Sequence, residues 1–329
     1  MVSIKLENLS KNFIYHKKEL GFINSIKNLI KREKVLKTVV KDVSFQIHEG
    51  EFVGLIGSNG AGKTTLLKMI AGIIYPSSGN ITVLGYRPFD KKNNFKRQIS
   101  IIMGNKSQLM WDLPVNESLY LNKCIYEVPD EEFYNIVNFL SENLNVKKLL
   151  NVQVRRLSFG ERIKMEIIAG LIHNPKLILL DEPMIGLDSV SRRKIKEFLK
   201  YYNKKYNSTI ILTSHYINDI ESLCNKVLIL NKGRLFFDGN FCDIEKKLKN
   251  KNKLIKLKFE RFIKNEELKK YGELNFNDGY NAVIAVPYDK TSEIVKYMLF
   301  SLPIVDLNIA GVPLEEIILS LSEGNINLC

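Results

Sequence analysis

The sequence has few cysteines, and its hydrophobic runs are short. It contains four cysteines, at positions 124, 224, 242 and 329. Because they form no CxxC pair and no cluster with histidine, neither a zinc site nor a disulfide framework is predicted. The longest apolar runs, such as Leu177–Leu180, fall far short of the roughly 20 residues that cross a bilayer. The amino terminus alternates polar and apolar residues and lacks the apolar core of a signal peptide. We therefore expect no membrane span and a cytoplasmic location.

Acidic residues are outnumbered by basic ones, which gives a formal net charge of +13. Such an excess can indicate a nucleic-acid or anionic-membrane partner. The lysines are nevertheless scattered among many Asn and Ile residues, and no basic face interleaved with aromatic residues occurs. We therefore predict no specific nucleic-acid partner. One basic block, His16–Lys37, stands apart and contains a candidate amphipathic helix, Phe22–Ile30.

Apolar strand-like segments alternate with helical segments through about residue 240. The predicted strands are 40–47, 52–56, 81–84, 99–103, 177–180, 209–212 and 227–230. Helices are predicted at 63–71, at 162–172 and, with Asp130 as N-cap, at Glu131–Leu144. Short apolar runs bounded by helices are typical of strands buried in a parallel sheet, so the pattern predicts an α/β fold.

A smaller α+β segment is predicted beyond a lysine- and asparagine-rich stretch at Lys249–Lys253. A short helix near 243–248 precedes this stretch. The segment itself has strand candidates at 254–259, 282–286 and 305–309, and helix candidates at 291–302 and 313–321. It offers no cluster of titratable groups, so we expect it to fold without performing chemistry.

A phosphate-binding loop of the form GxxxxGK[ST] follows the strand 52–56 and precedes a helix. Its residues are Gly57, Ser58, Asn59, Gly60, Ala61, Gly62, Lys63 and Thr64, and Thr65 comes next. The glycines let successive backbone N–H groups converge on phosphates at a helix N-terminus. Lys63 is expected to neutralise the β- and γ-phosphate oxygens, and Thr64 to bind Mg²⁺. The motif therefore predicts a nucleoside triphosphate site.

Two adjacent acids end the strand 177–180. Asp181 followed by Glu182 is the order expected for a magnesium-anchoring aspartate beside a carboxylate that activates water. The same pair is often only a solvated turn, but its position downstream of a phosphate loop favours the catalytic interpretation.

Further motifs resemble those of the ATP-binding cassette (ABC) family. Leu157-Ser158-Phe159-Gly160-Glu161 resembles the signature usually written LSGGQ, Gly186-Leu187-Asp188 resembles the loop after the catalytic glutamate, and Thr213-Ser214-His215 resembles the switch histidine motif. The resemblance covers residues 1 to about 240. It implies a P-loop NTPase of ABC type with a RecA-like core, an antiparallel β subdomain and a helical subdomain at about 105–172. A linker at 241–253 and a small α+β accessory domain at 254–329 would follow.

In this family the signature faces the nucleotide that a second subunit holds. The resemblance therefore implies a dimer with a second copy or a homologous ATPase subunit, in which Ser158, Gly160 and Asp188 contact ATP and Glu182 and His215 are catalytic. It also implies ATP and Mg²⁺ as cofactors, with Thr64 and Asp181 as magnesium ligands. An integral membrane permease would be the further partner, and it would hold the chain at the cytoplasmic face of the membrane.

Four positions depart from the family pattern or stay open. The family's glutamine after the strand 99–103 corresponds to Asn105, which could bind the nucleotide and Mg²⁺, although nearby Gln108 could substitute. The signature carries Phe159 and Glu161 where Gly and Gln are usual. The family's adenine-stacking aromatic corresponds to Phe13 or Tyr15, of which Phe13 fits the register better.

The insert 16–37, the SQLMWDLPV run and the C-terminal VPLEEIILSL run resemble ATPases paired with ABC-2-type exporter subunits. The basic helix in the insert would contact lipid headgroups or the permease, or would simply be solvated. Polysaccharide exporters are an alternative, because they also carry amino-terminal insertions. Soluble ABC ATPases that act on ribosomes or DNA form another class, but they generally have paired cassettes or long coiled coils, which this chain lacks.

Overall fold

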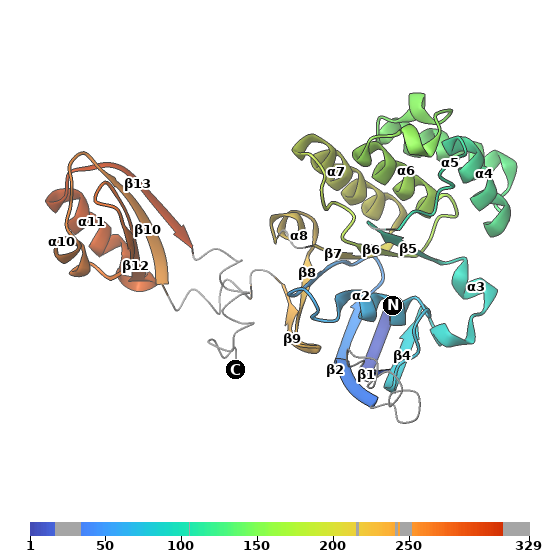
Figure 1. Ribbon diagram of the computed structural model, residues 1–329, viewed down its shortest axis with the longest axis horizontal. Coiled ribbons are helices and arrows are strands. Elements are labelled where there is room, and N and C mark those ends of the chain that lie inside the picture. The colour runs from blue at the N-terminus through green and yellow to red at the C-terminus, as the bar shows by residue number, and fades with distance from the viewer. Residues whose placement is uncertain (17–33, 105, 215–216, 241–242, 244–251, 312–329) are drawn as a thin grey trace, which may run out of the picture. The chain divides into compact units, whose positions relative to one another are not determined.

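A computed structural model of the protein describes residues 1–329 except 17–33, 105, 215–216, 241–242, 244–251 and 312–329 (Figure 1). The chain divides into two compact units, residues 1–238 and 239–329. The finer division into a cassette, a linker and an accessory domain stays a prediction. Across the described ranges, no helix is long and apolar enough to cross a membrane.

A six-stranded sheet organises the first unit in the order β5-β6-β7-β3-β8-β9. Its strands are β3 (Phe52–Ile56), β5 (Ile99–Met103), β6 (Leu177–Asp181), β7 (Thr209–Thr213), β8 (Lys226–Asn231) and β9 (Arg234–Gly239). The neighbouring strands from β5 through β8 are parallel. β3, β6 and β7 are buried at every residue, which explains their unbroken apolar sequences. The predicted α/β fold class is confirmed.

A three-stranded antiparallel sheet in the order β2-β1-β4 forms a second layer. Its strands are β1 (Val2–His16), β2 (Lys34–His48) and β4 (Ser78–Val83). β2 begins six residues earlier than predicted, because β1 continues through Tyr15 and pairs with β2 as far as His16↔Lys34. The flanks of the predicted insert 16–37 are therefore strand, whereas the candidate helix 22–30 lies outside the described residues.

Helices cover both faces of the six-stranded sheet. They are α2 (Lys63–Ile70), α3 (Asn93–Lys96), α4 (Val115–Tyr126), α5 (Asp130–Asn143), α6 (Phe159–Leu171), α7 (Ser189–Tyr206) and α8 (Ile217–Leu223). In Figure 1, α4 to α7 lie on one side of this sheet, and α2 and the antiparallel sheet lie on the other. The N-cap of α5 is Pro129 and not the predicted Asp130, which is the first helical residue and pairs with Lys123 at 2.7 Å.

The core of the first unit lies where α2 packs between the two sheets. Leu66 and Met69 of α2 join Val53 and Leu55 of β3 and residues of β1 and β2 in one buried cluster. On the opposite face of β3, a Cβ at Gly54 would lie 2.0 Å from Ile220 Cγ2 of α8, so glycine is needed for the close approach of that helix. The interlocked layers hold the carboxyl ends of β3, β6 and β7 at one edge of the sheet.

In its described residues, the second unit has a four-stranded antiparallel sheet in the order β11-β12-β10-β13 and the helices α10 and α11. Its elements are β10 (Asn252–Phe259), α10 (Asn265–Lys269), β11 (Glu273–Asn277), β12 (Asn281–Pro287), α11 (Thr291–Ser301) and β13 (Ile304–Gly311). Leu257 and Phe259 pack in a core that includes Met298 and Leu302. β10 begins inside the predicted linker, because Lys253 pairs with Val286 of β12. The predicted helix 313–321, and all of 243–248 except Asp243, lie outside the described residues.

Candidate functional site

The phosphate-binding loop joins β3 to α2. Gly60 and Gly62 have positive φ angles of 80° and 105°, a backbone region that glycine adopts at no steric cost. A Cβ at Gly62 would lie 2.7 Å from the carbonyl oxygen of Val39 on β2, so the second sheet also requires glycine there. Gly62 is the N-cap of α2, and no side chain caps this helix. The first amides of α2 therefore face the loop and can bind an anion.

Lys63 is buried within this loop. Its side chain is 6% exposed, and Nζ donates hydrogen bonds to the carbonyl oxygens of Gly57 at 2.8 Å and Ser58 at 3.3 Å. Burial lowers the pKa of the Lys63 ammonium, while the nearby charges of Glu182 and Asp181 oppose this effect. Nζ lies 4.0 Å from Glu182 Oε1, so the loop cation and the acid that directly follows β6 share one electrostatic environment.

Asp181 connects three elements at the edge of the sheet. Its Oδ2 accepts a hydrogen bond from Thr64 Oγ1 of α2 at 2.7 Å, and Oδ1 accepts one from Thr213 Oγ1 of β7 at 2.8 Å. The backbone N–H of Glu182 also donates to Thr213 Oγ1, at 2.9 Å. Carboxylate and hydroxyl oxygens are the ligands that Mg²⁺ prefers, so this donor set fits that ion. Sequence reasoning named Thr64, Asp181 and Glu182, whereas it quoted Thr213 only within the Thr213-Ser214-His215 motif and gave it no role at the site.

The signature residues begin α6. Ser158 is its N-cap: Ser158 Oγ accepts from the Glu161 N–H at 3.3 Å, and Glu161 Oε2 accepts from the Ser158 N–H at 2.8 Å. This is a capping box, and it gives the unusual Glu161 a local role. Hydrogen bonds from the hydroxyl and the N–H of Ser158 lower the pKa of Glu161. The start of α6 packs beside the start of α7, because a Cβ at Gly160 would lie 3.1 Å from Ser191 Oγ.

Asp188 is the N-cap of α7 and accepts hydrogen bonds from the N–H groups of Val190 and Ser191 at 2.9 and 2.8 Å. These bonds, those of Ser191 above all, lower its pKa. The hydrogen bonds of Ser158 and Asp188 in the described part stay within their own helix ends. The structure therefore brings together the phosphate loop, Asp181 and Glu182, and separately the starts of α6 and α7.

The remaining predicted site residues have different outcomes. Asn105 and His215 lie outside the described residues. Gln108 directs its amide back to the Ile101 carbonyl oxygen of β5, at 3.2 Å. Phe13 and Tyr15 are both exposed on β1, and Phe13 pairs in register with Lys37, two residues from the Val39 carbonyl that approaches Gly62. The register thus brings Phe13 nearer than Tyr15 to the phosphate loop.

Comparisons with known proteins identify the family of this chain. The profile of the ABC transporter family matches residues 40–185. The ABC transporter ATP-binding protein NatA of Bacillus subtilis is 35% identical over 208 residues, which span 63% of this chain and 84% of NatA. The chain belongs to the family of ABC transporter ATP-binding proteins. Binding and hydrolysis of ATP are the activity of this family, and the predicted family and enzyme class are confirmed.

Other ABC relatives cover the same part of the chain. The Nod factor export ATP-binding protein I of Rhizobium leguminosarum bv. viciae is 34% identical over 203 residues, or 62% of this chain and 65% of that protein. A solved ATP-binding subunit of an ABC transporter matches with a TM-score of 0.62 and 27% identity, over 74% of this chain and 92% of that one. A dimeric ATP-binding cassette solved with ADP and Pi has a TM-score of 0.60 and 23% identity, over 72% of this chain and 98% of that one, which shows the fold alone. The second unit matches the C-terminal domain of EvrA-like ABC transporters at residues 251–310.

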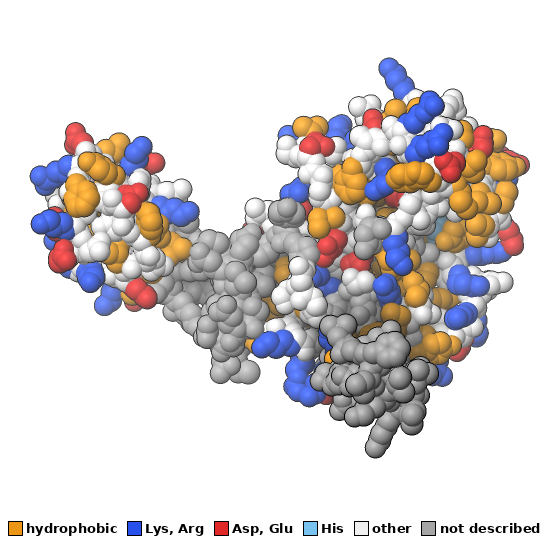
Figure 2. Space-filling model, viewed as in Figure 1, with side chains coloured by type: hydrophobic (Ala, Val, Ile, Leu, Met, Phe, Trp, Pro, Cys, Tyr) orange, Lys and Arg blue, Asp and Glu red, His pale blue; other side chains and the backbone are white. Residues whose placement is uncertain are grey.

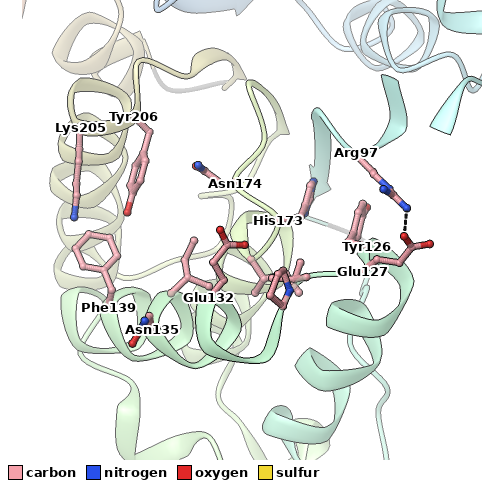
Figure 3. A pocket seen from close by; sticks show the side chains of 14 residues that line it. Arg97, Tyr126, Glu127, Glu132, Asn135, Phe139, His173, Asn174, Lys205 and Tyr206 are labelled. Carbon is pink, nitrogen blue, oxygen red and sulfur yellow. Dashed lines mark hydrogen bonds and ion pairs between the residues drawn. The ribbon is translucent and has the colours of Figure 1, made fainter. Parts of the chain in front are cut away.

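A separate cavity of about 490 Å³ lies away from the phosphate loop of the cassette (Figure 3). It lies at the amino ends of β5 and β6, and its lining includes α5 and the end of α7. The His173 ring stacks on Tyr126 with centroids 3.8 Å apart, and its Nε2 lies 3.1 Å from the Ile99 carbonyl oxygen. Burial lowers the pKa of His173 to about 4, so the ring is neutral at physiological pH. The structure gives this histidine a packing role remote from the phosphate-binding loop.

Proposed function

We propose that this chain is the ATP-hydrolysing subunit of an ABC exporter and works as one half of a nucleotide-sandwich dimer. The observation that carries the proposal is the arrangement around Asp181, whose carboxylate bridges Thr64 of the phosphate loop and Thr213 of β7. Lys63 lies 4.0 Å from Glu182 beside it. Phosphoryl transfer to water requires a phosphate-binding loop, oxygen atoms that can bind Mg²⁺ and a carboxylate that can act as a base.

Each group has a separate task in this proposal. The amides of residues 57–65 and the Lys63 ammonium bind the phosphates of ATP. Thr64, Asp181 and Asn105 would hold Mg²⁺, and this ion would neutralise negative charge on the phosphates. Glu182 accepts the proton of the attacking water, and His215 orients this water and the γ-phosphate. Phe13 stacks on the adenine ring, with Tyr15 as the alternative.

The second half of the site comes from the other subunit. α6 is a 13-residue helix, and the positive end of its dipole lies at Ser158, where backbone N–H groups favour an anion. In this structure the Ser158 hydroxyl and N–H donate to Glu161 of the capping box. In the closed dimer, the nucleotide of a second subunit would take the place of Glu161 as their partner. Gly160 and Asp188 belong to the same surface. ATP would then hold the dimer closed, and hydrolysis would release it.

A membrane partner is supported by the surface of the helical layer and by the exporter relatives. Exposed apolar side chains lie just before α4, at Met110 and Trp111, and along α4 itself, at Tyr120 and Ile125. Figure 2 shows hydrophobic side chains gathered over this part of the layer. Such a patch marks an interaction surface. We infer that it contacts the permease, which would hold the chain at the cytoplasmic face of the membrane.

Substitution of Lys63 by Ala tests the proposal. It removes the cation built into the phosphate loop, so ATP affinity and phosphate release should both be lost. The measurements are fluorescent-ATP binding and phosphate release with Mg²⁺, with the exposed Lys147→Ala as the matched control. Unchanged ATP affinity and turnover in Lys63→Ala would refute the assignment of the site.

A further inference from the structure

A buried carboxylate with no part in the proposed chemistry lies on the signature helix. Glu166 of α6 is 2% exposed. It lies eight residues beyond Ser158, about 12 Å along the helix axis at about 1.5 Å per residue. Burial raises its pKa, while hydrogen bonds from Ser107 and the backbone of Gln108 and Leu109 oppose the shift. A carboxylate is costly to bury unless it is hydrogen-bonded, so these bonds are what retain it in the core.

Glu166 holds the loop that follows β5. Its Oε1 accepts a hydrogen bond from the Ser107 hydroxyl, and Oε2 accepts one from the Gln108 N–H at 2.9 Å. Two residues further on, the Met110 N–H donates to Ser118 Oγ of α4 at 3.1 Å. The loop backbone is therefore bound to side chains of α6 and α4, and we expect it to move with these two helices.

The other end of the same loop touches the proposed catalytic strand end. The Gly104 N–H donates to the Asp181 carbonyl oxygen at 3.0 Å. A Cβ at Gly104 would lie 2.5 Å from the carbonyl oxygen of Glu182, so the two backbones are in close contact. A shift of the backbone at Asp181 and Glu182 would therefore reach Gly104 at the start of the loop, and Glu166 holds the loop further on at Ser107 and Gln108.

We propose that Glu166 is a positioning residue, which ties the loop after β5 to the signature helix. Through this tie the nucleotide state at Asp181 and Glu182 sets the orientation of Ser158. The proposal rests on the proposed function, because Ser158 is taken to bind the nucleotide of a second subunit. Glu166 touches no reacting atom, and its effect passes through the loop and the helix.

The chain contains a reporter for this tie. Trp111 is its single tryptophan. The Arg162 guanidinium of α6 lies 5.3 Å from the Trp111 ring and 5.2 Å from the Phe159 ring. Because Trp111 follows the loop and Arg162 belongs to α6, tryptophan fluorescence should change when the signature helix moves relative to the loop.

The experiment compares Glu166→Ala and Glu166→Gln in the full chain. Alanine removes both acceptor oxygens, whereas glutamine keeps an acceptor for the Gln108 N–H and can donate to the Ser107 hydroxyl oxygen. We expect Glu166→Ala to lower kcat about tenfold, as for other coupling networks, and to abolish the tryptophan response to Mg²⁺-ATP. ADP affinity should change by less than about twofold. Glu166→Gln should restore both kcat and the fluorescence response, and Glu131→Gln, exposed on α5, serves as the control.

Ser107→Ala is the second variant, because it removes one partner of Glu166 and leaves the buried helix intact. The double variant Ser107→Ala/Glu166→Ala should be no worse than Glu166→Ala alone. If the wild-type chain shows no ATPase activity and Glu182→Gln forms no ATP-dependent dimer, the proposed function fails, and this inference fails with it. If both behave as proposed while Glu166→Ala and Ser107→Ala keep parental kcat and fluorescence response, only this inference is overturned. Equal loss of ADP affinity and kcat in Glu166→Ala would overturn it as well.

Discussion

Two adjacent carboxylates at the end of β6 have different surroundings. The Asp181 side chain is buried and bonded by two threonine hydroxyls, whereas the Glu182 side chain is 26% exposed and lies near Lys63. Glu182 also has a φ angle of 53°, a left-handed conformation that costs a non-glycine residue about 1–2 kcal/mol. Its N–H bond to Thr213 holds this turn in place. The strand end therefore separates a buried carboxylate, the proposed metal ligand, from a more accessible one, the proposed base.

The role of Glu182 is tested by Glu182→Gln. Glutamine keeps the shape and hydrogen bonding of the side chain but cannot accept the proton of the attacking water, so hydrolysis should fall about 10²-fold or more. ATP binding and dimer closure should survive. Size-exclusion chromatography with ATP and Mg²⁺, run beside a phosphate-release assay, measures both. A variant that stays monomeric and hydrolyses ATP at the parental rate would show that the base lies elsewhere.

His173 should make stability depend on pH in the acid range. Its folded-state pKa is about 4, below the ordinary value of 6.5. Between these values the unfolded chain binds a proton that the folded chain excludes, so the contribution is complete above about pH 6.5 and is lost as the pH falls toward 4. The loss amounts to at most about 3 kcal/mol. This loss of stability on acidification should be smaller in His173→Phe, which keeps an aromatic ring to stack on Tyr126.

Urea unfolding from pH 7 to pH 4 measures this effect. The exposed His48→Asn is the control, and it should keep the parental pH dependence. The idea is wrong if His173→Phe loses as much stability on acidification as the wild-type chain.

At the scale of elements, three helix N-termini differ in how they are capped. α2 begins at Gly62 without a side-chain cap, α6 at Ser158 with a capping box, and α7 at Asp188 with two accepted hydrogen bonds. An uncapped terminus leaves its amides for phosphate, whereas capped termini are stable by themselves. This difference agrees with α2 binding the nucleotide of its own chain. For α6 to act on the nucleotide of a second subunit, the hydrogen bonds of its capping box would have to give way to the phosphate.

Ser158→Arg tests the role of the α6 terminus. The long side chain should block the surface that faces the second subunit, so ATP-dependent dimerisation and ATPase activity should be lost. Loss of the cap should also cost about 1 kcal/mol of stability. ATP binding to the single subunit should stay nearly intact. Ser158→Ala separates the two effects, because it removes the cap without adding bulk, and unchanged ATPase activity in Ser158→Arg would refute the composite site.

At the scale of the whole molecule, each unit has its own hydrophobic core. The core of the first unit joins α2 to two sheets, and that of the second unit joins β10 and β12 to α11. Units with separate cores are generally able to fold alone. A chain ending at residue 250 should therefore fold and bind ATP with parental affinity, measured by circular dichroism and fluorescent-ATP titration. A folded truncated chain that cannot bind nucleotide would place part of the site in the second unit.

Much of the fold and of the site could be predicted from the chain alone, because these features depend on near neighbours. The phosphate loop needs glycines and a lysine at set spacings, and buried parallel strands such as β3 and β6 are unbroken apolar runs. The ABC resemblance followed from the order of such local motifs. β11 was not predicted, because its sequence ELNFN is largely exposed and has no alternation of buried and exposed residues. The N-cap of α5 is Pro129 because of the backbone conformation there, which the presence of Asp130 in the sequence does not indicate.

Tertiary structure decided which distant residues meet. Thr213 reaches Asp181 only because β6 and β7 are parallel and in register, across 32 residues of chain. Glu166 meets Ser107 across 59 residues, and no local pattern distinguishes it from a solvated acid on the polar face of a helix. The low pKa of His173 likewise arises from burial. Local motifs reflect what the backbone needs within a few residues, whereas these contacts depend on how separate elements pack, which no short stretch of sequence encodes.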